Sequence, residues 1–314
     1  MSGHNYLILP HLKVFDANAF TGKLTFGFPA LTSFGGAVDK VMRHINEKLP
    51  QLRAEGFGVI CHDFELKMHR KFSNQEFQPV YKKKPMVLAG QKIKQPSFIP
   101  EISCDLEVTL LIMVEGLKNN EADLMLSLAD GSVNSNLKIA KGRIKKAEKA
   151  IFIQLADTDK EKIEELLKEK IKAGYALVSR QALVKREMEQ GKDALEILCD
   201  YLCESVTEIN NDTDKQLRLV AHKAEGNLVP VCTGYRAISS SQVVRNQRDP
   251  DCSHVFAENI ITLGEFVSSS TINNLENLLW YRVSDDLNNM AFIQKQENSI
   301  AESNLTETVN YDIN

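Results

Sequence analysis

Residues 6–49, YLILPHLKVFDANAFTGKLTFGFPALTSFGGAVDKVMRHINEKL, decide how the chain is organised. Apolar side chains alternate over residues 6–14, as in a β-strand, and Pro10 predicts an edge strand or a bulge because it has no N–H for the ladder. From Leu31 to Leu49 apolar residues recur at helical spacing instead. A strand, a loop with glycines and aromatics, and a helix are therefore expected. The residues expected on one face of the strand are Tyr6, Ile8, Leu12 and Val14.

Two glycines interrupt the expected helix. Gly35 and Gly36 each cost about 1 kcal/mol relative to alanine in a helix interior. Two explanations are open: a ligand approaches the helix backbone closely, or the helix packs tightly on a sheet.

Composition limits the classes of protein to consider. The chain has 314 residues and a formal net charge of −4, so one large or two modest domains are expected, and nothing global argues for a nucleic-acid partner. No apolar run approaches the roughly 20 residues of a membrane span, and no signal-peptide pattern opens the sequence. Six cysteines without a C-x-x-C predict reduced thiols, a cytoplasmic protein and no metal site.

Two further stretches predict strands. In residues 57–68, Ile60, His62, Phe64, Leu66 and Met68 share a face, where a lone histidine is more often a hydrogen-bonded core residue than a base or a ligand. Residues 102–114 alternate most cleanly, with one polar face. Strand, helix, strand, strand predicts an α+β, ferredoxin-like antiparallel sheet covered by helices. The two faces of residues 102–114 are Cys104, Leu106, Val108, Leu110, Ile112 and Val114 against Asp105, Glu107 and Thr109.

The second half reads as mostly helical before strands return. Asp130-Gly131 predicts a turn, and helices follow at 158–174 and 195–206. We expect residues 1–131 and 221–295 to form one ferredoxin-like domain, residues 132–220 a largely helical insertion, and residues 296–314 a disordered acidic tail. A last helix near 275–281 and a last strand at 290–293 are also expected.

Two segments are strongly basic. Residues 69–100 interleave seven lysines and arginines with aromatics, and residues 138–149 carry a second run. Cations with aromatics between them suit a single-stranded polyanion through phosphate pairing and base stacking. The alternative is that these side chains contact only water.

A late segment, LVPVCTGYRAISSSQVVRNQRDP at residues 228–250, combines a short strand with a Ser-rich loop. Arginine forks bind phosphates at two points, and asparagine can read base edges, so Arg236, Arg245, Asn246 and Arg248 suit nucleic-acid recognition. The alternative is a structural loop in which Arg248 pairs with a neighbouring aspartate.

A catalytic constellation is not found. ANAFTGKL at residues 17–24 lacks both the first glycine and the magnesium-binding hydroxyl of a phosphate-binding loop, and no zinc, calcium or nucleophile-elbow motif occurs. The seven histidines form no local cluster. KLTFGF at residues 23–28 only loosely follows the aromatic RNA-binding strand of ferredoxin-like modules. No enzyme activity and no cofactor are predicted from these residues.

Several segments together resemble a known family. LILPHLKVFDANAFTGKLTFGFPALTSF, GFGVICHDFE, GYALVSRQALV, LVPVCTGYRAIS with VRNQRDP, and ENIITLGEFVS with LENLLWYR are similar to the second subunit of the type I-F CRISPR surveillance (Csy) complex. That family lies in the Cas-five branch of the ferredoxin-like RAMP proteins. The resemblance runs in order over residues 6–293 and is thin over 118–171 and 208–227.

The resemblance implies a non-catalytic subunit. Such proteins cap the 5′ handle of the guide (CRISPR) RNA, pair with the large subunit and start the row of backbone subunits. A separate endoribonuclease cleaves the guide, and target DNA is chosen by base pairing with the guide, so this chain would meet it indirectly. No membrane partner is implied.

The sequence also departs from the family. Phe26 stands where a tryptophan is typical, SSSQVV is shorter than the usual loop, and residues 114–124 leave little room for the second helix of a ferredoxin-like module. The inserted segment, which includes the basic run at residues 138–149, differs most from the family.

We therefore predict RNA binding at two loops and one basic run. Phe26 and Phe28 either stack on bases or fill the core under the first helix. Two rival functions stay open: a repeat-cleaving CRISPR endoribonuclease, for which His11 and His62 would be tested, and a structural adaptor without RNA contact. The predicted RNA-binding residues are Asn18, Phe26, Phe28, Arg143, Lys145, Lys146, Arg236, Arg245, Asn246 and Arg248.

Overall fold

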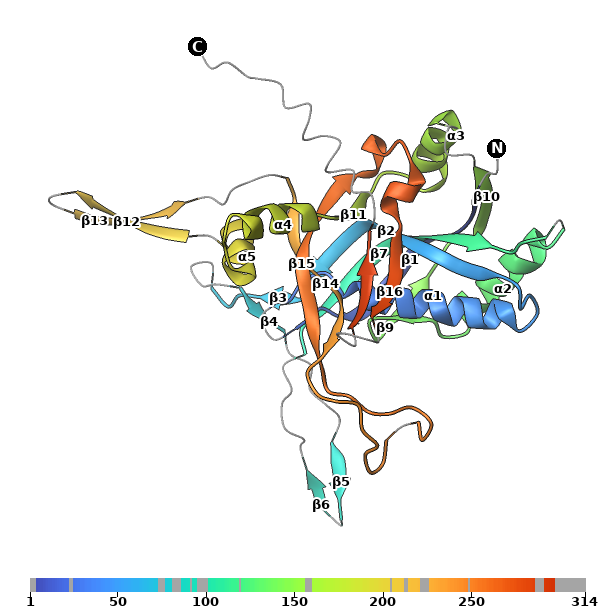
Figure 1. The fold of residues 1–314 in the computed structure, drawn as a ribbon, viewed down its shortest axis with the longest axis horizontal. Helices are drawn as coiled ribbons and strands as arrows, with labels where there is room; N and C mark the ends of the chain where they lie inside the picture. The colour runs from blue at the N-terminus through green and yellow to red at the C-terminus, as the bar shows by residue number, and fades with distance from the viewer. Residues whose placement is uncertain are drawn as a thin grey trace.

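The chain folds around one large antiparallel sheet with helices on both faces, so it is α+β (Figure 1). The computed structural model describes residues 4–22, 25–72, 77–80, 86–90, 92–94, 101–118, 120–155, 160–203, 205–211, 214–220, 226–247, 249–285 and 291–296. The strands of this sheet are β1 (His4–Asn18), β2 (Arg53–Leu66), β7 (Ser103–Glu115), β8 (Lys138–Ile139), β9 (Gly142–Lys146), β10 (Ile151–Leu155), β11 (Tyr175–Ser179), β14 (Leu228–Ala237), β15 (Ala257–Ser268), β16 (Trp280–Asp285) and β17 (Ala291–Lys295). The helices are α1 (Leu31–Asn46), α2 (Ala122–Asn134), α3 (Lys160–Glu165), α4 (Gln181–Glu189) and α5 (Ala194–Leu202).

Helix α1 confirms the predicted stripe and decides the question of its glycines. Its buried residues include Leu31, Phe34, Val41 and Ile45, as the helical spacing indicated. A Cβ on Gly35 would lie 2.9 Å from Nε2 of Gln294 on β17. Tight packing on the sheet therefore explains Gly35. No described atom lies within 4 Å of a Cβ built on Gly36.

A bulge in β1 changes which face its side chains take. Between Leu9 and Leu12 the strand has one more residue than its partner β7, and His11 adopts a φ of 49°. Tyr6 and Ile8 consequently pack in one core, whereas Leu12 and Val14 pack in the other. The single face predicted for these four residues is wrong, because one inserted residue reverses the alternation. The predicted bulge is present, but β1 is not an edge strand, since β7 and β10 flank it.

Strand β2 bulges at the same level. Cys61 lies opposite Val108 and Asp63 opposite Glu107, which leaves His62 as the extra residue. Ile60 therefore packs in the second core, while Leu66 packs against the first, and the one face predicted for residues 60–68 is also wrong.

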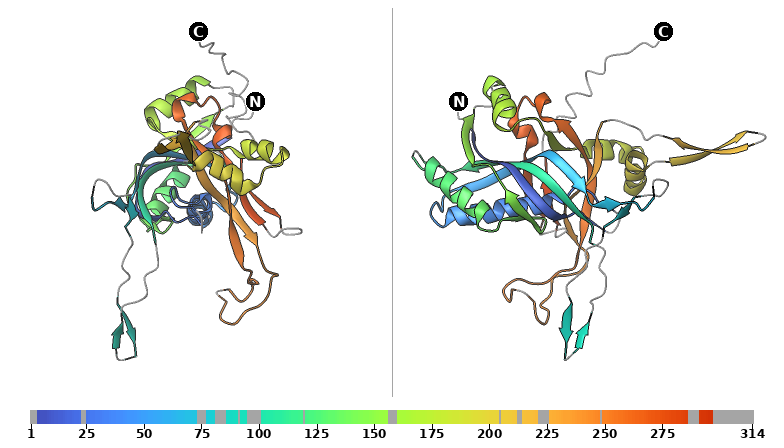
Figure 2. Two further views of the ribbon diagram at one scale, coloured as in Figure 1. Left: turned by 90° about the vertical axis from the view of Figure 1, so that its left-hand side faces the viewer. Right: turned by 180° about the vertical axis from the view of Figure 1, so that it is seen from behind.

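Strand β7 is regular and behaves as predicted. Its even-numbered residues from Cys104 to Val114 are all buried on the face covered by α1 and α2. Leu111 and Met113 point to the opposite face, where the apolar residues of α3 and the helical turn Leu166–Lys170 cover them. Figure 2 shows α1 and α2 on one side of the sheet and α3 on the other.

The strands of the second half close a circuit of pairings. Starting from β2, the neighbouring strands are β16, β17, β14, β15 and β11. Strand β11 also pairs with β2, at Tyr175–Cys61, and this pairing closes the circuit. Trp280 is buried inside and donates from Nε1 to the carbonyl of Leu177, 3.0 Å away. This bond joins β16 to β11 across the circuit.

Three local predictions need correction. Asp130 and Gly131 lie inside α2 rather than in a turn, because Met125, Ala129 and Val133 form a buried stripe one turn apart. The chain thus holds a longer second helix than residues 114–124 suggested. The expected helix at 275–281 is one 3₁₀ turn, Leu275–Leu278, followed by β16.

Residues 132–220 are more mixed than expected. Helices α3, α4 and α5 are present, but β8 to β11 belong to the main sheet, and β12 (Ser205–Asn211) pairs with β13 (Asp214–Val220). Packing against β1 and β15 recruits these strands, which local sequence does not encode. The domain boundaries stay a prediction.

The remaining segments lie at the periphery. The long basic stretch at 69–100 contains parts of β3 (Met68–His69) with β4 (Gln78–Pro79), and of β5 (Val87–Ala89) with β6 (Lys92–Lys94). The predicted tail from residue 297 lies outside the described residues. Gln296, which we placed in that tail, is buried and holds Ser179 and Asn277 by hydrogen bonds. None of the described helices has the length and apolar character to cross a bilayer.

Candidate nucleic-acid interface

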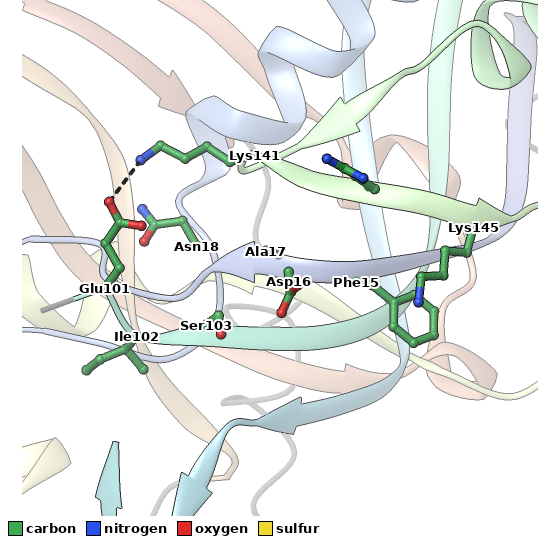
Figure 3. Close-up of a pocket in the computed structure, with 10 residues that line it drawn as sticks. Phe15, Asp16, Ala17, Asn18, Glu101, Ile102, Ser103, Lys141 and Lys145 are labelled. Atoms are coloured by element: carbon green, nitrogen blue, oxygen red, sulfur yellow. Dashed lines mark ion pairs between the residues drawn. The ribbon is translucent and has the colours of Figure 1, made fainter. Parts of the chain in front are cut away.

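A basic groove lies where β1 ends and β9 crosses it (Figure 3). Its volume is about 500 Å³. The floor comes from the end of β1 and the start of β7, and the wall from the β8–β9 hairpin. The residues that line this groove are Phe15, Asp16, Ala17, Asn18, Glu101, Ile102, Ser103, Lys141, Arg143 and Lys145.

Backbone geometry shapes the groove. A second bulge in β1, between Val14 and Ala17, puts Asp16 at a φ of 58°. Strand β9 then passes so close to β1 that a Cβ on Gly142 would lie 2.8 Å from Cα of Ala17. Only glycine fits there. This close approach sets the basic side chains of β9 directly beside the bulge.

The hairpin turn that carries Lys141 is strained. Ala140 and Lys141 both have positive φ, 47° and 66°, in a two-residue connection between Ile139 and Gly142. Residues other than glycine, asparagine and aspartate rarely adopt such angles, and backbone strain of this kind clusters at functional sites. The backbone N–H of Asn18 donates to the carbonyl of Ala140 at 2.7 Å, and this hydrogen bond holds the turn against β1.

Cations outnumber acids in the groove. Lys145 lies over the ring of Phe15, with Nζ 4.0 Å from the ring centroid. Lys141 forms a long ion pair with Glu101, at 3.8 Å, and the Lys141 side chain is well exposed. The other acid, Asp16, pairs with Lys67 at 2.6 Å. The groove is therefore a positive site on a chain whose total charge is negative.

These groups suit a polyanion with aromatic rings. Arg143 and Lys145 lie two residues apart on β9, and both line the groove. A guanidinium can bind a phosphate at two points, and an ammonium acts as a point charge. The partly buried ring of Phe15 and the side-chain amide of Asn18 line the same groove. The arrangement can neutralise phosphates.

Asn18 links this groove to a second hollow. Its side chain donates to the carbonyl of Phe20 at 3.1 Å and accepts from the Phe20 amide at 3.3 Å. Phe20 lines a hollow of about 540 Å³ together with Ile238 and Ile261. Asn259 of β15 donates to the carbonyl of Thr21 in the same place. The loop between β1 and α1 (the first loop) therefore meets the base of the loop between β14 and β15 (the late loop).

The late loop projects from one end of the molecule (Figures 1 and 2). Arg236 is still on β14, exposed, opposite Glu258, whereas Arg245 and Asn246 lie in the loop itself and are exposed. Gln247 organises the loop: its Nε2 donates to the carbonyls of Asp249, Pro250 and Cys252. Arg248 lies outside the described residues.

The two predicted phenylalanines take different positions. Phe28 is buried and packs on Phe34 and Phe266, with ring centroids 5.4 and 5.1 Å away. The structure thus favours the core alternative for Phe28. Phe26 is 47% exposed and borders a separate pocket.

Lys146 is not among the residues that line the groove. It lies opposite Lys13 of β1, and the register shifts between this pair and the pair Val14–Ile144, so Lys145 is an extra residue at a bulge of β9.

On the polar face of β7 the acidic side chains already have cationic partners. Glu107 pairs with Lys13 at 2.8 Å, and Asp105 pairs with Lys67 at 2.8 Å. Hydrogen bonding to Glu107 raises the pKa of Lys13. Burial alone would raise the pKa of Glu107, but its bonds to Lys13 and His11 outweigh burial and lower it.

The two bulge histidines form a stacked pair across β7. Their ring centroids are 4.3 Å apart, and Nε2 of His62 lies 2.8 Å from Oγ1 of Thr109. His11 is buried and bonds Glu107 through Nδ1 at 2.7 Å. Burial lowers the pKa of His62, against the opposing effect of the Ala173 carbonyl. His62 is hydrogen-bonded, as expected, but it is half-buried at the bulge of β2 rather than a core residue.

Sequence reasoning missed several residues of the interface. Phe15, Lys141 and Phe20 were not selected, although Lys141 lies within the basic run at residues 138–149. No sequence signal indicates that Gly142 must approach Ala17, because the contact joins residues distant in the chain. Within the described part of the chain, no group of three or more potential ligands could hold a metal ion.

Comparison with known proteins gives two concordant results. A family model described as "CRISPR-associated protein (Cas_Csy2)" matches residues 7–293. The chain is also 28% identical over 300 residues to a Pseudomonas aeruginosa (strain UCBPP-PA14) protein named "CRISPR-associated protein Csy2". That alignment covers 88% of this chain and 90% of the relative.

Proposed function

Because the chain belongs to the Csy2 family, the second subunit of the type I-F CRISPR surveillance (Csy) complex, we propose that it binds and caps the 5′ handle of the guide RNA. In this proposal it also pairs with the large subunit and starts the row of backbone subunits. Target DNA meets it only through the guide.

The basic groove carries the RNA-binding part of the proposal. Three cations, Lys141, Arg143 and Lys145, gather there on a chain of net charge −4. Phosphate contacts dominate the affinity of proteins for nucleic acids, so a local positive groove is the feature that RNA binding requires. The exposed Arg245 and Asn246 of the late loop would extend the contact along the strand.

The strand order supports a ferredoxin-like, RAMP-type core. The strands run β2, β7, β1, β10 across the sheet and are all antiparallel, with α1 after β1 and α2 after β7. This is the order that two β-α-β units give when they interlock in one sheet. The second circuit of strands would then be an addition to that core.

A non-catalytic role is supported by the positions of the histidines that the endoribonuclease alternative requires. His11 is buried, and the rings of His11 and His62 stack on each other outside the basic groove. A general base must reach its proton within hydrogen-bond distance. RNA bound in the groove would not meet either ring. We further propose a cytoplasmic location, where guide RNA is available.

Salt-dependent binding of the full chain to 5′ handle RNA tests the proposal. In the Arg143→Ala/Lys145→Ala variant we expect weaker binding and a log–log salt slope that is shallower by about 1.4, or roughly 0.7 per lost phosphate contact on a single strand. Lys146→Ala, compared with Lys145→Ala alone, is the matched control, since each removes one lysine from β9 and Lys146 does not line the groove. Equal loss in both variants would contradict the assignment to the groove.

Two further measurements address the rival functions. Repeat RNA incubated with the purified chain without metal should stay intact; site-specific cleavage that His11→Ala or His62→Ala abolishes would show an endoribonuclease. In the assembled complex, RNA carrying a photoreactive uridine in the handle should crosslink to the groove or the late loop. Crosslinks only to other subunits would contradict RNA binding by this chain and support the structural adaptor without RNA contact.

A further inference from the structure

An aromatic pocket lies apart from the basic groove. It has a volume of about 490 Å³ and is formed by the first loop, β2, β11, β14 and β15. Three of its side chains stay partly exposed, Phe26 at 47%, Phe64 at 37% and Tyr175 at 51%. Exposed aromatic side chains that gather around one pocket are suited to an interaction site.

The pocket is preformed. Its floor is Phe28, whose ring packs on Phe34 and meets Phe266 edge-on, so the floor belongs to the main core. Between Phe26 and Phe28, Gly27 has a φ of 143°, an angle that side chains other than hydrogen strongly disfavour. That residue lets Phe28 point inward while Phe26 stays at the rim. A binding partner would not need to order this surface first.

The charges of the pocket are opposite to those of the groove. None of the residues that line it is a lysine or an arginine, and the acid among them is Asp63. An RNA strand brings phosphates with every base, so this rim disfavours it. An apolar side chain beside a cation would instead fill the pocket and pair with Asp63.

We propose that this pocket docks the large subunit, taking one aliphatic or aromatic side chain that is presented beside a lysine or arginine. The inference rests on the proposed function for the identity of the partner. It assigns RNA and protein to two separate surfaces of the chain, and it gives Phe26 a protein contact in place of a base.

Two binary assays with the full chain test this separation. The first measures recovery of the large subunit on the tagged chain without guide RNA, and the second measures binding of 5′ handle RNA alone. Phe26→Ser and Asp63→Lys should each lower recovery of the large subunit by about tenfold or more and leave the Kd for RNA within about twofold. Leu195→Ser, at a residue 53% exposed on α5, is the matched control and should change neither.

A pocket that holds an RNA base instead of a protein side chain would give different results for these variants. If the pocket held a base, Phe26→Ser would weaken RNA binding and Asp63→Lys would strengthen it, which would overturn the inference. Unchanged recovery in both variants, or no recovery by the wild-type chain, would also overturn it. A wild-type chain that recovers the large subunit but binds no handle RNA would contradict the proposed function and leave the pocket assignment standing. Thermal melting of each variant confirms that it folds.

Discussion

At the residue scale, single atoms decide where the basic strand lies. A Cβ on Gly142 would meet Cγ1 of Val14 at 2.6 Å and backbone atoms of Ala17 at 2.8 and 2.9 Å. Backbone cannot move aside as a flexible side chain can. Because Gly142 has no side chain, β9 can lie against β1. This contact places Lys141, Arg143 and Lys145 over the β1 bulge.

Gly142→Ala and Gly36→Ala should change stability in opposite directions. Overpacking against the β1 backbone should make Gly142→Ala less stable by about 1–3 kcal/mol. Gly36→Ala should gain about 0.5–1 kcal/mol, because the added methyl in α1 meets no described atom within 4 Å and alanine favours a helix. Urea unfolding of both variants checks the pair. A stabilised Gly142→Ala would show that β9 is not held against β1 as described.

His62 should make stability depend on pH. Burial lowers its pKa in the folded chain, so the unfolded chain takes up a proton first as the pH falls. The contribution of neutral His62 to the free energy of unfolding is complete above about pH 6.5, the usual pKa of histidine. It is lost as the pH falls toward the lower pKa of the folded chain. The free energy of unfolding should drop between pH 7.5 and 5.5, before Glu107 titrates.

The comparison variants for that measurement are His62→Gln and His69→Gln. His62→Gln should narrow the difference in unfolding free energy between the two pH values. His69 is exposed on β3, so its replacement should leave the difference unchanged. An equal effect of both replacements would assign the pH dependence to exposed histidines in general.

At the scale of elements, the bulges matter more than the strands' own propensities. The extra residues in β1 and β2 face each other across β7, and both contact Thr109. Each bulge reverses the faces of the strand beyond it, so one strand serves two cores. The same device, repeated at Asp16, opens the groove at the end of β1.

The late loop depends on one side chain. Gln247 donates to three carbonyls and accepts from the amide of Val244 at 3.0 Å. Gln247→Ala should free the loop and weaken handle RNA binding by about 1–2 kcal/mol, on the order of tenfold in Kd. Melting temperature should not move, because the loop is outside both main cores.

Gln242→Ala is the matched control in the same loop. Gln242 pairs with His254 through backbone atoms, which a substitution leaves in place. RNA binding measured by fluorescence anisotropy should separate the two variants. Equal binding by both would mean that the loop does not contact RNA or does not need its shape.

At the scale of the whole molecule, the closed circuit of strands joins the two halves of the chain. Trp280 and Leu177, from β16 and β11, pack in the same core as β1, α1 and β7. A core shared in this way should unfold as one cooperative unit. Two surfaces with opposite charge, the groove and the aromatic pocket, are then held in a fixed relation.

The only tryptophan in the sequence tests that cooperativity. Trp280 is buried, so its emission should shift to longer wavelength on unfolding. In urea, this shift and the loss of far-ultraviolet circular dichroism should have the same midpoint. Transitions that differ in midpoint would show that the second half opens separately.

The sequence by itself determined the features that depend on local pattern. The stripe of α1, the two faces of β7, the helices α3 and α5 and the last strand follow from periods of 3.6 and 2. Collinear similarity was sufficient for the family, which the comparisons confirmed. Arg143, Lys145 and Asn18 could be selected because charge and residue type need no coordinates.

Only the tertiary structure decided how these parts meet. The bulges of β1 and β2 arise from pairing with β7, and α2 forms across an Asp-Gly pair because its apolar stripe packs in the core. Pairing with β1 leaves Lys145 as an extra residue of β9, and Arg143 and Lys145 line the groove whereas Lys146 does not. Pairing between distant segments sets the face of every side chain, and local sequence does not contain it.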